Sequence, residues 1–446
     1  MSKVFYPILL TVFLILNLYL NNVDEVPLKD VWLPLGVSLI GIGLVWTIFR
    51  YILKNKDKAG IVVLVVTILL FNYGWIKTRW PTIDIVGEMG STALLLLLML
   101  LVVLGITWLV RRKRNLGWIT RYFNIVGIIL VGILIIQAYP AISNIKEFIE
   151  IEPVDIGREL SKDIYYIILD EYARQDTLDE YFGYDNSWFI EGLEDRGFHI
   201  NSESKANYDW TVLSLSSTLN MRYHVEESKE FLPYEHIANS SVASTLKSVG
   251  YEYIMVSNAP WRNSSKFGEL RSYKAFSLPI SNFSDYLILH TPLKPISLLF
   301  NLQAEKVLYT FRETSKIPNI EERTFTFTYI QCPHPPFVFD KDGNKVTREP
   351  SKEAYLEQLI FIGKKTLDLV DTLLPSDPII ILQSDTGPGP YIGLEGNEYE
   401  KERMKILNAY YGFSGMYKGI TPVNTFRTLF GIELLEDKSY LGWLEE

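Results

Sequence analysis

The feature that most limits how this chain can fold is the concentration of apolar residues in its first third. Five runs there reach or approach spanning length: Val4–Leu20, Trp32–Phe49, Ile61–Ile76, Ala93–Val110 and Tyr122–Ile142. A bilayer core needs about 20 apolar residues per helix and accepts about 17. The sequence therefore predicts a bundle of five transmembrane helices in residues 1–145. The third run is the least regular, because Asn72 and Tyr73 interrupt its end.

The charges between these runs predict their orientation. One basic cluster follows the second run, and another lies between the fourth and fifth runs; together they comprise Arg50, Lys54, Lys56, Lys58, Arg111, Arg112, Lys113, Arg114 and Arg121. The positive-inside rule places these loops and the N-terminus in the cytoplasm, and everything after the fifth run outside. No charged side chain lies deep within a run. Because ion pathways normally carry one, this absence favours an anchor over a transporter or channel.

Residues 163–446 have the mixed character of a large globular domain, and residues 146–162 read as its linker. Short apolar patterns typical of strands occur at Ile164–Leu169, Tyr251–Val256, Thr324–Gln331 and Pro378–Gln383, with a fifth indicated at Lys405–Tyr411. Helical patterns lie between them, including one that starts after Ser351 and runs to about Leu374. This alternation predicts an α/β domain with a central, largely parallel sheet.

Overall charge and cysteine content exclude some classes of function and structure. The net charge of −9 argues against a nucleic-acid partner, and no basic-aromatic stripe appears outside the membrane region. Cys332 is the single cysteine, so the fold cannot depend on an intrachain disulfide.

Two predicted strands end in acidic residues. The first leads into Asp170 and Glu171, and the strand at Pro378–Gln383 leads into Asp385. Open α/β sheets bind ligands at the carboxyl ends of their strands. A lone acidic residue at a strand end is often just solvated. Two carboxylates delivered to one sheet edge can share a cation, which is what makes the pair a candidate metal site.

Two further residues have chemical use at comparable positions. Thr211 stands before a helical pattern, where free N–H groups and the helix dipole would meet its hydroxyl. It is either an ordinary helix N-cap or a nucleophile. His334 follows a strand and is flanked by Pro333 and Pro335. It is either a turn histidine without a role, or a residue that acts as a general acid or donates a hydrogen bond to phosphate.

Taken together, the motifs LDEYAR, WTVLSLSSTLNM, CPHPPF and SDTG resemble the alkaline phosphatase and sulfatase superfamily. The nearer likeness is to its membrane branch, which includes lipoteichoic acid synthase and phosphoglycerol transferases and has five N-terminal spans with an external catalytic domain. Matched to the family pattern, Asp170 and Asp385 stand at metal-ligand positions, Thr211 at the nucleophile and His334 at the substrate-side histidine. The resemblance covers essentially the whole chain and implies an alkaline-phosphatase-like fold.

One position departs from that pattern. The family has His, or Asn in sulfatases, after the second Asp, and this chain has Thr386. A site built from Asp170, Asp385, Thr211 and Thr386 offers only oxygen ligands. Such a site favours one divalent cation, Mn²⁺ or Mg²⁺ with Ca²⁺ as the alternative, over zinc.

The resemblance and the predicted topology imply a membrane-anchored, metal-dependent phosphotransferase or phosphodiesterase in a bacterial inner or plasma membrane. Its catalytic domain would be extracytoplasmic, and its substrate a lipid headgroup or a cell-envelope polysaccharide. Thr386 motivates the alternative of a weakened or inactive sulfatase-like protein that binds such a ligand without turnover. Candidate substrate contacts are Arg174, Arg222, Trp261 and Arg262.

Overall fold

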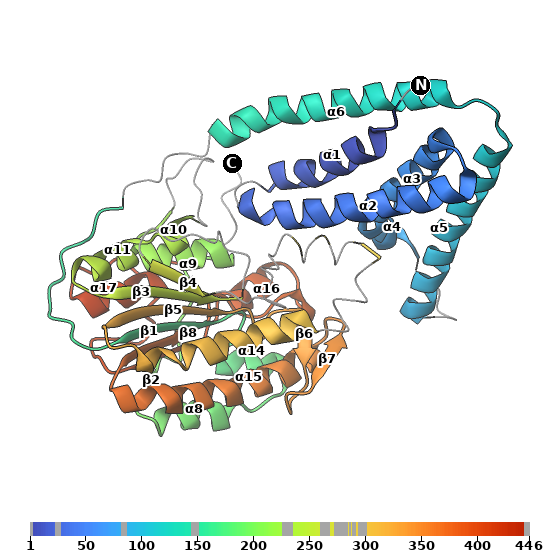
Figure 1. Cartoon of the computed structure of the whole chain (residues 1–446). Coiled ribbons are helices and arrows are strands. Elements are labelled where there is room, and N and C mark those ends of the chain that lie inside the picture. The colour runs from blue at the N-terminus through green and yellow to red at the C-terminus, as the bar shows by residue number, and fades with distance from the viewer. Residues whose placement is uncertain are drawn as a thin grey trace. The chain divides into compact units, whose positions relative to one another are not determined.

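The chain forms two compact units. A computed structural model describes residues 3–22, 28–81, 87–143, 151–224, 235–258, 268–271 and 301–440, together with Ser284, Leu287, Thr291 and Pro292. One unit comprises Met1–Glu147 and Phe276–Phe300, and the other comprises Phe148–Ala275 and Asn301–Glu446. Each is described by itself below (Figure 1).

The regular secondary structure in the described residues of the first unit is all helical. Its helices are α1 (Tyr6–Leu20), α2 (Trp32–Leu53), α3 (Lys56–Phe71), α4 (Tyr73–Arg79), α5 (Gly87–Arg112) and α6 (Gly117–Ser143). Helices α1 and α6 pack along each other, and the Asn124 side chain accepts from the N–H groups of Phe5 and Tyr6 at 3.0 Å. The side chain of Asn55 caps α3 by accepting from two first-turn N–H groups.

The expected count of five spans is reproduced only in part. Three helices within the described residues are long and apolar enough to cross a membrane: Trp32–Leu53, Gly90–Arg112 and Gly117–Ala138. Helices α3 and α4 form a fourth candidate span, bent by 57°. The break falls at Asn72, where the sequence already showed an interruption. Helix α1 is apolar but has only 15 residues, which is short for a bilayer core.

The second unit is built on a seven-stranded sheet in the order β2-β9-β8-β1-β5-β3-β4. Its strands are β1 (Ile164–Leu169), β2 (His199–Ile200), β3 (Glu252–Ser257), β4 (Gly268–Arg271), β5 (Thr324–Ile330), β8 (Ile379–Gln383) and β9 (Asn408–Tyr411). The run from β8 to β4 is parallel, while β9 and β2 join antiparallel at one edge. A separate hairpin pairs β6 (Phe337–Phe339) with β7 (Lys345–Arg348). The expected α/β domain with a largely parallel sheet is confirmed.

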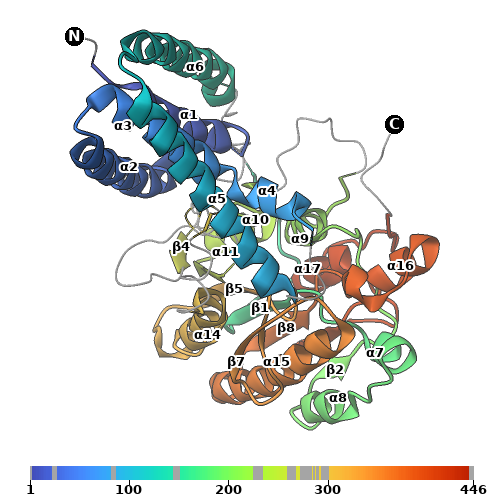
Figure 2. The same ribbon diagram turned by 90° about the vertical axis from the view of Figure 1, so that its right-hand side faces the viewer.

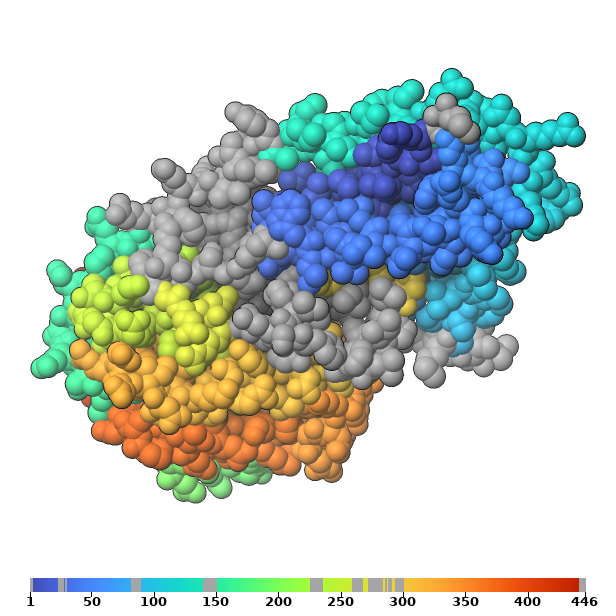
Figure 3. Space-filling model, viewed as in Figure 1, coloured from blue at the N-terminus to red at the C-terminus, as the bar shows by residue number. Residues whose placement is uncertain are grey.

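Helices cover both faces of this sheet (Figure 1). One face carries α8 (Ser187–Glu194), α14 (Leu302–Thr314) and α15 (Lys352–Leu373); the other carries α9 (Thr211–Asn220), α10 (Glu235–Ala238), α11 (Ser241–Ser248) and α17 (Thr425–Phe430). Figure 2 shows α8 near β2 and α14 toward the opposite edge of the sheet. Helices α14 and α15 form the yellow-orange and orange-red part of the surface of this unit seen in Figure 3. The remaining helices are α7 (Gln175–Phe182) and α16 (Gly396–Arg403).

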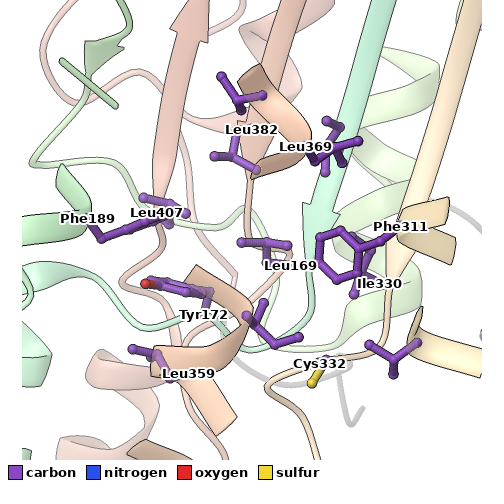
Figure 4. Packing of buried hydrophobic residues seen from close by; sticks show 14 of the residues in the cluster. Leu169, Tyr172, Phe189, Phe311, Ile330, Cys332, Leu359, Leu369, Leu382 and Leu407 are labelled. Atoms are coloured by element: carbon purple, nitrogen blue, oxygen red, sulfur yellow. The ribbon is translucent and has the colours of Figure 1, made fainter. Parts of the chain in front are cut away.

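Alternation along β1 explains why both faces are covered. Tyr165, Ile167 and Leu169 enter one core cluster, and Ile164, Tyr166 and Ile168 enter the other. Every residue of the strand is buried, as its unbroken apolar sequence predicts for a central parallel strand. Figure 4 shows the first cluster, in which Leu169 and Leu382 from neighbouring strands lie among side chains from α8, α14 and α15.

The segments expected from sequence mostly match these elements. Ser351 caps α15 by accepting from the Ala354 N–H at 3.1 Å. The segment Lys405–Tyr411 forms a strand only from Asn408, and that strand runs antiparallel to β8. Period-two patterns do not encode strand direction, so its orientation could not be read from the sequence.

Candidate metal and nucleophile site

The carboxyl ends of β1 and β8 bring two buried aspartates to one place. The strands pair in parallel with Ile168 opposite Gln383, so the residues that follow them leave the sheet at the same edge. Asp170 and Asp385 are 1% and 2% exposed. The backbone N–H of Glu171 donates to Oδ1 of Asp385 at 3.2 Å, which ties the two strand ends together.

Three oxygens at this edge are buried but have no hydrogen-bond partner: Asp170 Oδ1, Asp385 Oδ2 and Thr386 Oγ1. The other oxygen of Asp170 accepts from the Tyr329 hydroxyl at 2.5 Å. An unpaired buried polar atom normally costs about 1–3 kcal/mol, and a charged one more. Three such oxygens on adjoining strand ends therefore indicate that a ligand belongs there.

The electrostatics of the pair agree with this interpretation. Burial, followed by the neighbouring Asp385, raises the pKa of Asp170 well above its usual range. Burial also raises the pKa of Asp385, although hydrogen bonding to Thr211 and the charge of Arg403 oppose it. Two buried carboxylates that disfavour each other's ionised form are relieved by a cation between them.

The donor set fits a hard cation. Within the described residues, no group of three or more His, Cys, Asp or Glu side chains is arranged to hold a metal. The oxygens without partners come from two carboxylates and a hydroxyl. Oxygen-only donors suit Mg²⁺, Mn²⁺ or Ca²⁺ better than Zn²⁺.

Thr211 begins helix α9 beside this edge. The helix is held there because the Ser214 hydroxyl donates to the Asp385 carbonyl oxygen at 2.7 Å. The N-cap residue is Trp210, whose side chain does not cap the helix, so Thr211 is the first helical residue and not the N-cap. First-turn N–H groups without a side-chain cap can bind an anion, and the helix dipole favours negative charge at this end. The N-cap interpretation of Thr211 is therefore wrong, and the nucleophile interpretation stays open.

His334 lies on the loop after β5 and faces the same edge. The backbone N–H of His334 donates to the Asp170 carbonyl oxygen at 3.1 Å. The side-chain amide of Gln358 donates to the carbonyl oxygen of His334 at 3.2 Å. Ring atom Nδ1 contacts the Pro335 carbonyl oxygen, and Nε2 lies 3.9 Å from Oε1 of Glu171. Burial alone would lower the pKa of His334, but Asp170, Glu171 and Pro335 outweigh it and raise that pKa.

Sequence reasoning missed Arg403. Its Nη1 forms an ion pair with Oε1 of Glu171 and donates to the Gly387 carbonyl oxygen at 2.7 Å. Tyr391 donates to Oε2 of the same glutamate at 2.7 Å. Arg403 ends a polar helix far along the chain, and nothing in its local sequence distinguishes it from a solvated surface arginine.

Of the four proposed substrate contacts, the structure describes Arg174 and Arg222. Arg174 binds both oxygens of Asp176 at 2.7 and 2.8 Å and the Ser204 carbonyl oxygen at 2.9 Å, so its guanidinium is already engaged within the fold. Arg222 follows the far end of α9, about 15 Å from Thr211 at 1.5 Å per residue. Trp261 and Arg262 lie outside the described residues.

Solved structures similar to this chain carry names from the superfamily that its motifs resemble. The C-terminal periplasmic domain of EptC from Escherichia coli is 12% identical, with 58% of this chain and 76% of that chain covered and a TM-score of 0.37. The corresponding domain of phosphoethanolamine transferase EptC from Campylobacter jejuni is 13% identical, with coverage of 61% and 89% and a TM-score of 0.38. A protein in the alkaline phosphatase superfamily from Vibrio parahaemolyticus is 11% identical, with coverage of 62% and 68% and a TM-score of 0.41.

No family model and no curated protein matches the sequence. Because the identities are low and the TM-scores lie below 0.5, we base the functional proposal on the geometry of this chain.

Proposed function

We propose that this chain is a membrane-anchored, metal-dependent phosphotransferase or phosphodiesterase of the alkaline phosphatase and sulfatase superfamily. One observation carries the proposal. The buried, unpartnered oxygens of Asp170, Asp385 and Thr386 lie at the sheet edge where α9 presents Thr211. Metal-assisted phosphoryl transfer needs a nucleophile beside carboxylates that can bind a divalent cation.

The residues present fit one divalent cation, Mg²⁺ or Mn²⁺ first and Ca²⁺ as the alternative. Asp170, Asp385 and Thr386 would hold it, with Thr211 beside them. When bound, such a cation supplies positive charge for the nucleophile and for the oxygens of the phosphoryl group.

Thr211 performs the bond-making step in this proposal. Its Oγ attacks phosphorus of a phosphodiester, a P–O bond forms, and the P–O bond to the leaving alcohol breaks. The acceptor for the hydroxyl proton is the Asp385 carboxylate, whose pKa the adjoining Thr211 hydroxyl lowers. The N–H groups of the first turn of α9 face the phosphoryl oxygens and favour their negative charge.

His334 completes the reaction by moving protons at Nε2. A proton leaves this nitrogen for the oxygen of the leaving alcohol as that alcohol departs. Water or an acceptor hydroxyl then attacks phosphorus of the phosphothreonine and gives its proton back to Nε2. The P–O bond to Thr211 breaks, and its Oγ takes back the proton held by Asp385. The carbonyl oxygen of Pro335 at Nδ1 holds the ring so that Nε2 faces the site.

The anchor narrows the substrate class. The apolar helices of the first unit support a membrane anchor for the catalytic unit. The basic loop before α6 favours the extracytoplasmic side for the residues that follow this helix. A lipid headgroup is then the nearest donor, with a cell-envelope glycan or water as the acceptor.

The test uses the full chain purified in detergent. Hydrolysis of bis(p-nitrophenyl) phosphate and of a phosphoglycerol lipid is measured with Mn²⁺, Mg²⁺ or Ca²⁺ supplied. Wild type is compared with Thr211→Ala and with Ser241→Ala, which removes a hydroxyl from the first residue of neighbouring helix α11. We expect metal-dependent turnover that only Thr211→Ala abolishes. Equal rates for wild type and Thr211→Ala would overturn the proposal.

Thr386 favours one alternative, a protein that binds the same ligands without turnover. A hydroxyl is a weaker ligand than the imidazole that the superfamily places there. If wild type is inert with every metal but binds the phosphoglycerol lipid in a metal-dependent way, this alternative replaces the enzyme.

A further inference from the structure

A buried arginine lies against the acidic edge and contacts both of its strand-end loops. Arg403 is paired with Glu171, which directly follows Asp170, and it donates to the carbonyl oxygen of Gly387, which directly follows Thr386. The two paired side chains are 13% and 5% exposed. This is a fixed positive charge inside the site and not a solvated surface arginine.

Backbone contacts fix the position of Arg403 relative to the Thr386 loop. The N–H of Gly387 donates to the Arg403 carbonyl oxygen at 2.6 Å. A Cβ at Gly387 would lie 2.3 Å from the Glu402 carbonyl oxygen, so only glycine permits this approach. The two segments are therefore bonded in both directions.

A surrounding ion-pair network holds the turn that carries Arg403. Glu402 accepts from the Thr177 hydroxyl at 2.6 Å and pairs with Lys405 at 2.7 Å. Lys405 also pairs with Asp176, the partner of Arg174. Arg174, expected from the sequence to contact substrate, thus supports the turn that positions Arg403.

The charges of the site can be balanced in only a few ways. Asp170, Glu171 and Asp385 are buried together, and each acts on the charge of another. One guanidinium and one divalent cation together match the charge of these three carboxylates, before any proton on His334, whose Nε2 lies 3.9 Å from Glu171, is counted. A second divalent cation would leave a positive excess in a water-poor site, which is costly to bury.

We propose that Arg403 is the second positive centre of this site and that its fixed charge limits the site to one divalent cation. The proposal rests on the proposed function and deepens it. Arg403 acts here as a positioning residue: it neutralises Glu171, holds the Thr386 loop in place, and leaves Asp170 and Asp385 for the cation.

The test is a calorimetric titration of the metal-free full chain in detergent with Mn²⁺ alone. Arg403→Gln removes the fixed charge and makes the cluster more acidic. We therefore expect Mn²⁺ to bind about tenfold tighter, or with a second equivalent, while turnover of bis(p-nitrophenyl) phosphate falls about 100-fold. Arg403→Lys keeps the charge but not the forked donors, so we expect one equivalent at wild-type affinity and partial turnover.

Weaker Mn²⁺ binding by Arg403→Gln would identify an arginine with only a structural role. If Arg403 only connects the loops after β1 and β8, Arg403→Gln disorders the site and weakens both Mn²⁺ binding and activity. That result would overturn the proposal. Arg427→Gln is the matched control, because Arg427 bonds the carbonyl oxygens of Met221 and Glu433 away from this edge. It should lower thermal stability without tightening Mn²⁺ binding.

The calorimetric result separates this inference from the proposed function. If no variant turns over any substrate but Arg403→Gln still tightens Mn²⁺ binding, the enzyme proposal fails and the role of Arg403 stands. If wild type turns over and Arg403→Gln binds Mn²⁺ more weakly, the enzyme proposal stands and the role of Arg403 fails.

Discussion

Buried ionisable side chains lie near both ends of helix α9, but their charge differs between the two ends. At the start of the helix, Thr211 adjoins Asp385. Asp385 and Asp170, at the same sheet edge, each have an oxygen that has no partner. Beyond its end lie His224 and His236, which are 7% and 5% exposed. Burial, followed by the charge of Arg222, lowers the pKa of His224 to about 3 and that of His236 to about 4.

The difference shows why burial alone does not identify a functional site. A histidine with a lowered pKa is neutral near neutral pH and can be buried without a counter-ion. Two adjoining aspartates are ionised near neutral pH at their ordinary pKa, and burial raises the pKa of both. A cation beside them would stabilise the ionised form. The proposed cation would offset the buried charge at the start of α9, whereas the neutral histidines beyond its end need no counter-ion.

The largest expected effect comes from removing the nucleophile at the start of the helix. Thr211→Ala should reduce kcat for a phosphodiester by about 10³-fold or more, because no other group forms the covalent intermediate. Thr211→Ser keeps a hydroxyl and should retain measurable turnover. If kcat of Thr211→Ala is within tenfold of that of wild type, the start of α9 is not a catalytic site and does not differ in this way from the region beyond its end.

The next effect separates metal binding from folding. Asp385→Asn relieves repulsion between buried carboxylates, so the metal-free variant should melt about 2–4 °C higher than metal-free wild type. Added Mn²⁺ should raise the melting temperature of wild type but not of the variant. Asp371→Asn is the control, because Asp371 pairs with Arg196 on the surface. A variant that Mn²⁺ stabilises as strongly as wild type would show that Asp385 is not a ligand.

A smaller effect concerns the histidines beyond the end of α9. The folded chain keeps His224 neutral, whereas the unfolded chain binds a proton as the pH falls below about 6.5. Stability is therefore lost as the pH falls from about 6.5 toward the folded-state pKa. His224→Gln should lose about 1–2 kcal/mol less stability than wild type between about pH 7 and about pH 5.

Urea unfolding in the presence of a chelator measures this loss without a contribution from the metal site. The same acid sensitivity in wild type and His224→Gln would show that His224 is not buried in its neutral form.

The smallest effect is expected at Arg222. The length of α9 separates this residue from Thr211, so Arg222→Gln should change kcat/KM by less than about twofold. A loss above tenfold in the phosphodiester assay would place Arg222 back among the substrate contacts.

The sequence predicted the acidic edge because strand ends are local features. An apolar strand followed by an aspartate is visible at both Asp170 and Asp385, and parallel topology makes their meeting a consequence. Arg403 was not predictable in this way. It reaches Glu171 only because the polar segment before β9 folds back over the edge, and the packing of a solvated-looking helix leaves no periodic trace in sequence.

Arg174 shows which local contacts a sequence does not reveal. Its place four residues after Asp170 suggests a substrate contact, but Asp176 stands two residues away and accepts from two nitrogens of its guanidinium. In the membrane unit, the interruption at Asn72 was visible in the sequence. The 15-residue length of α1 was not, because the apolar run of the sequence extends beyond the turns that are helical.

The central claim is that the acidic edge beside Thr211 is a site for one divalent cation. The most direct measurement is an electron paramagnetic resonance titration of the metal-free full chain with Mn²⁺, repeated on the Asp170→Asn/Asp385→Asn double variant. We expect wild type to bind one equivalent tightly and the double variant to leave that equivalent free in solution. Equal binding by both proteins, or no binding by wild type, would contradict the claim.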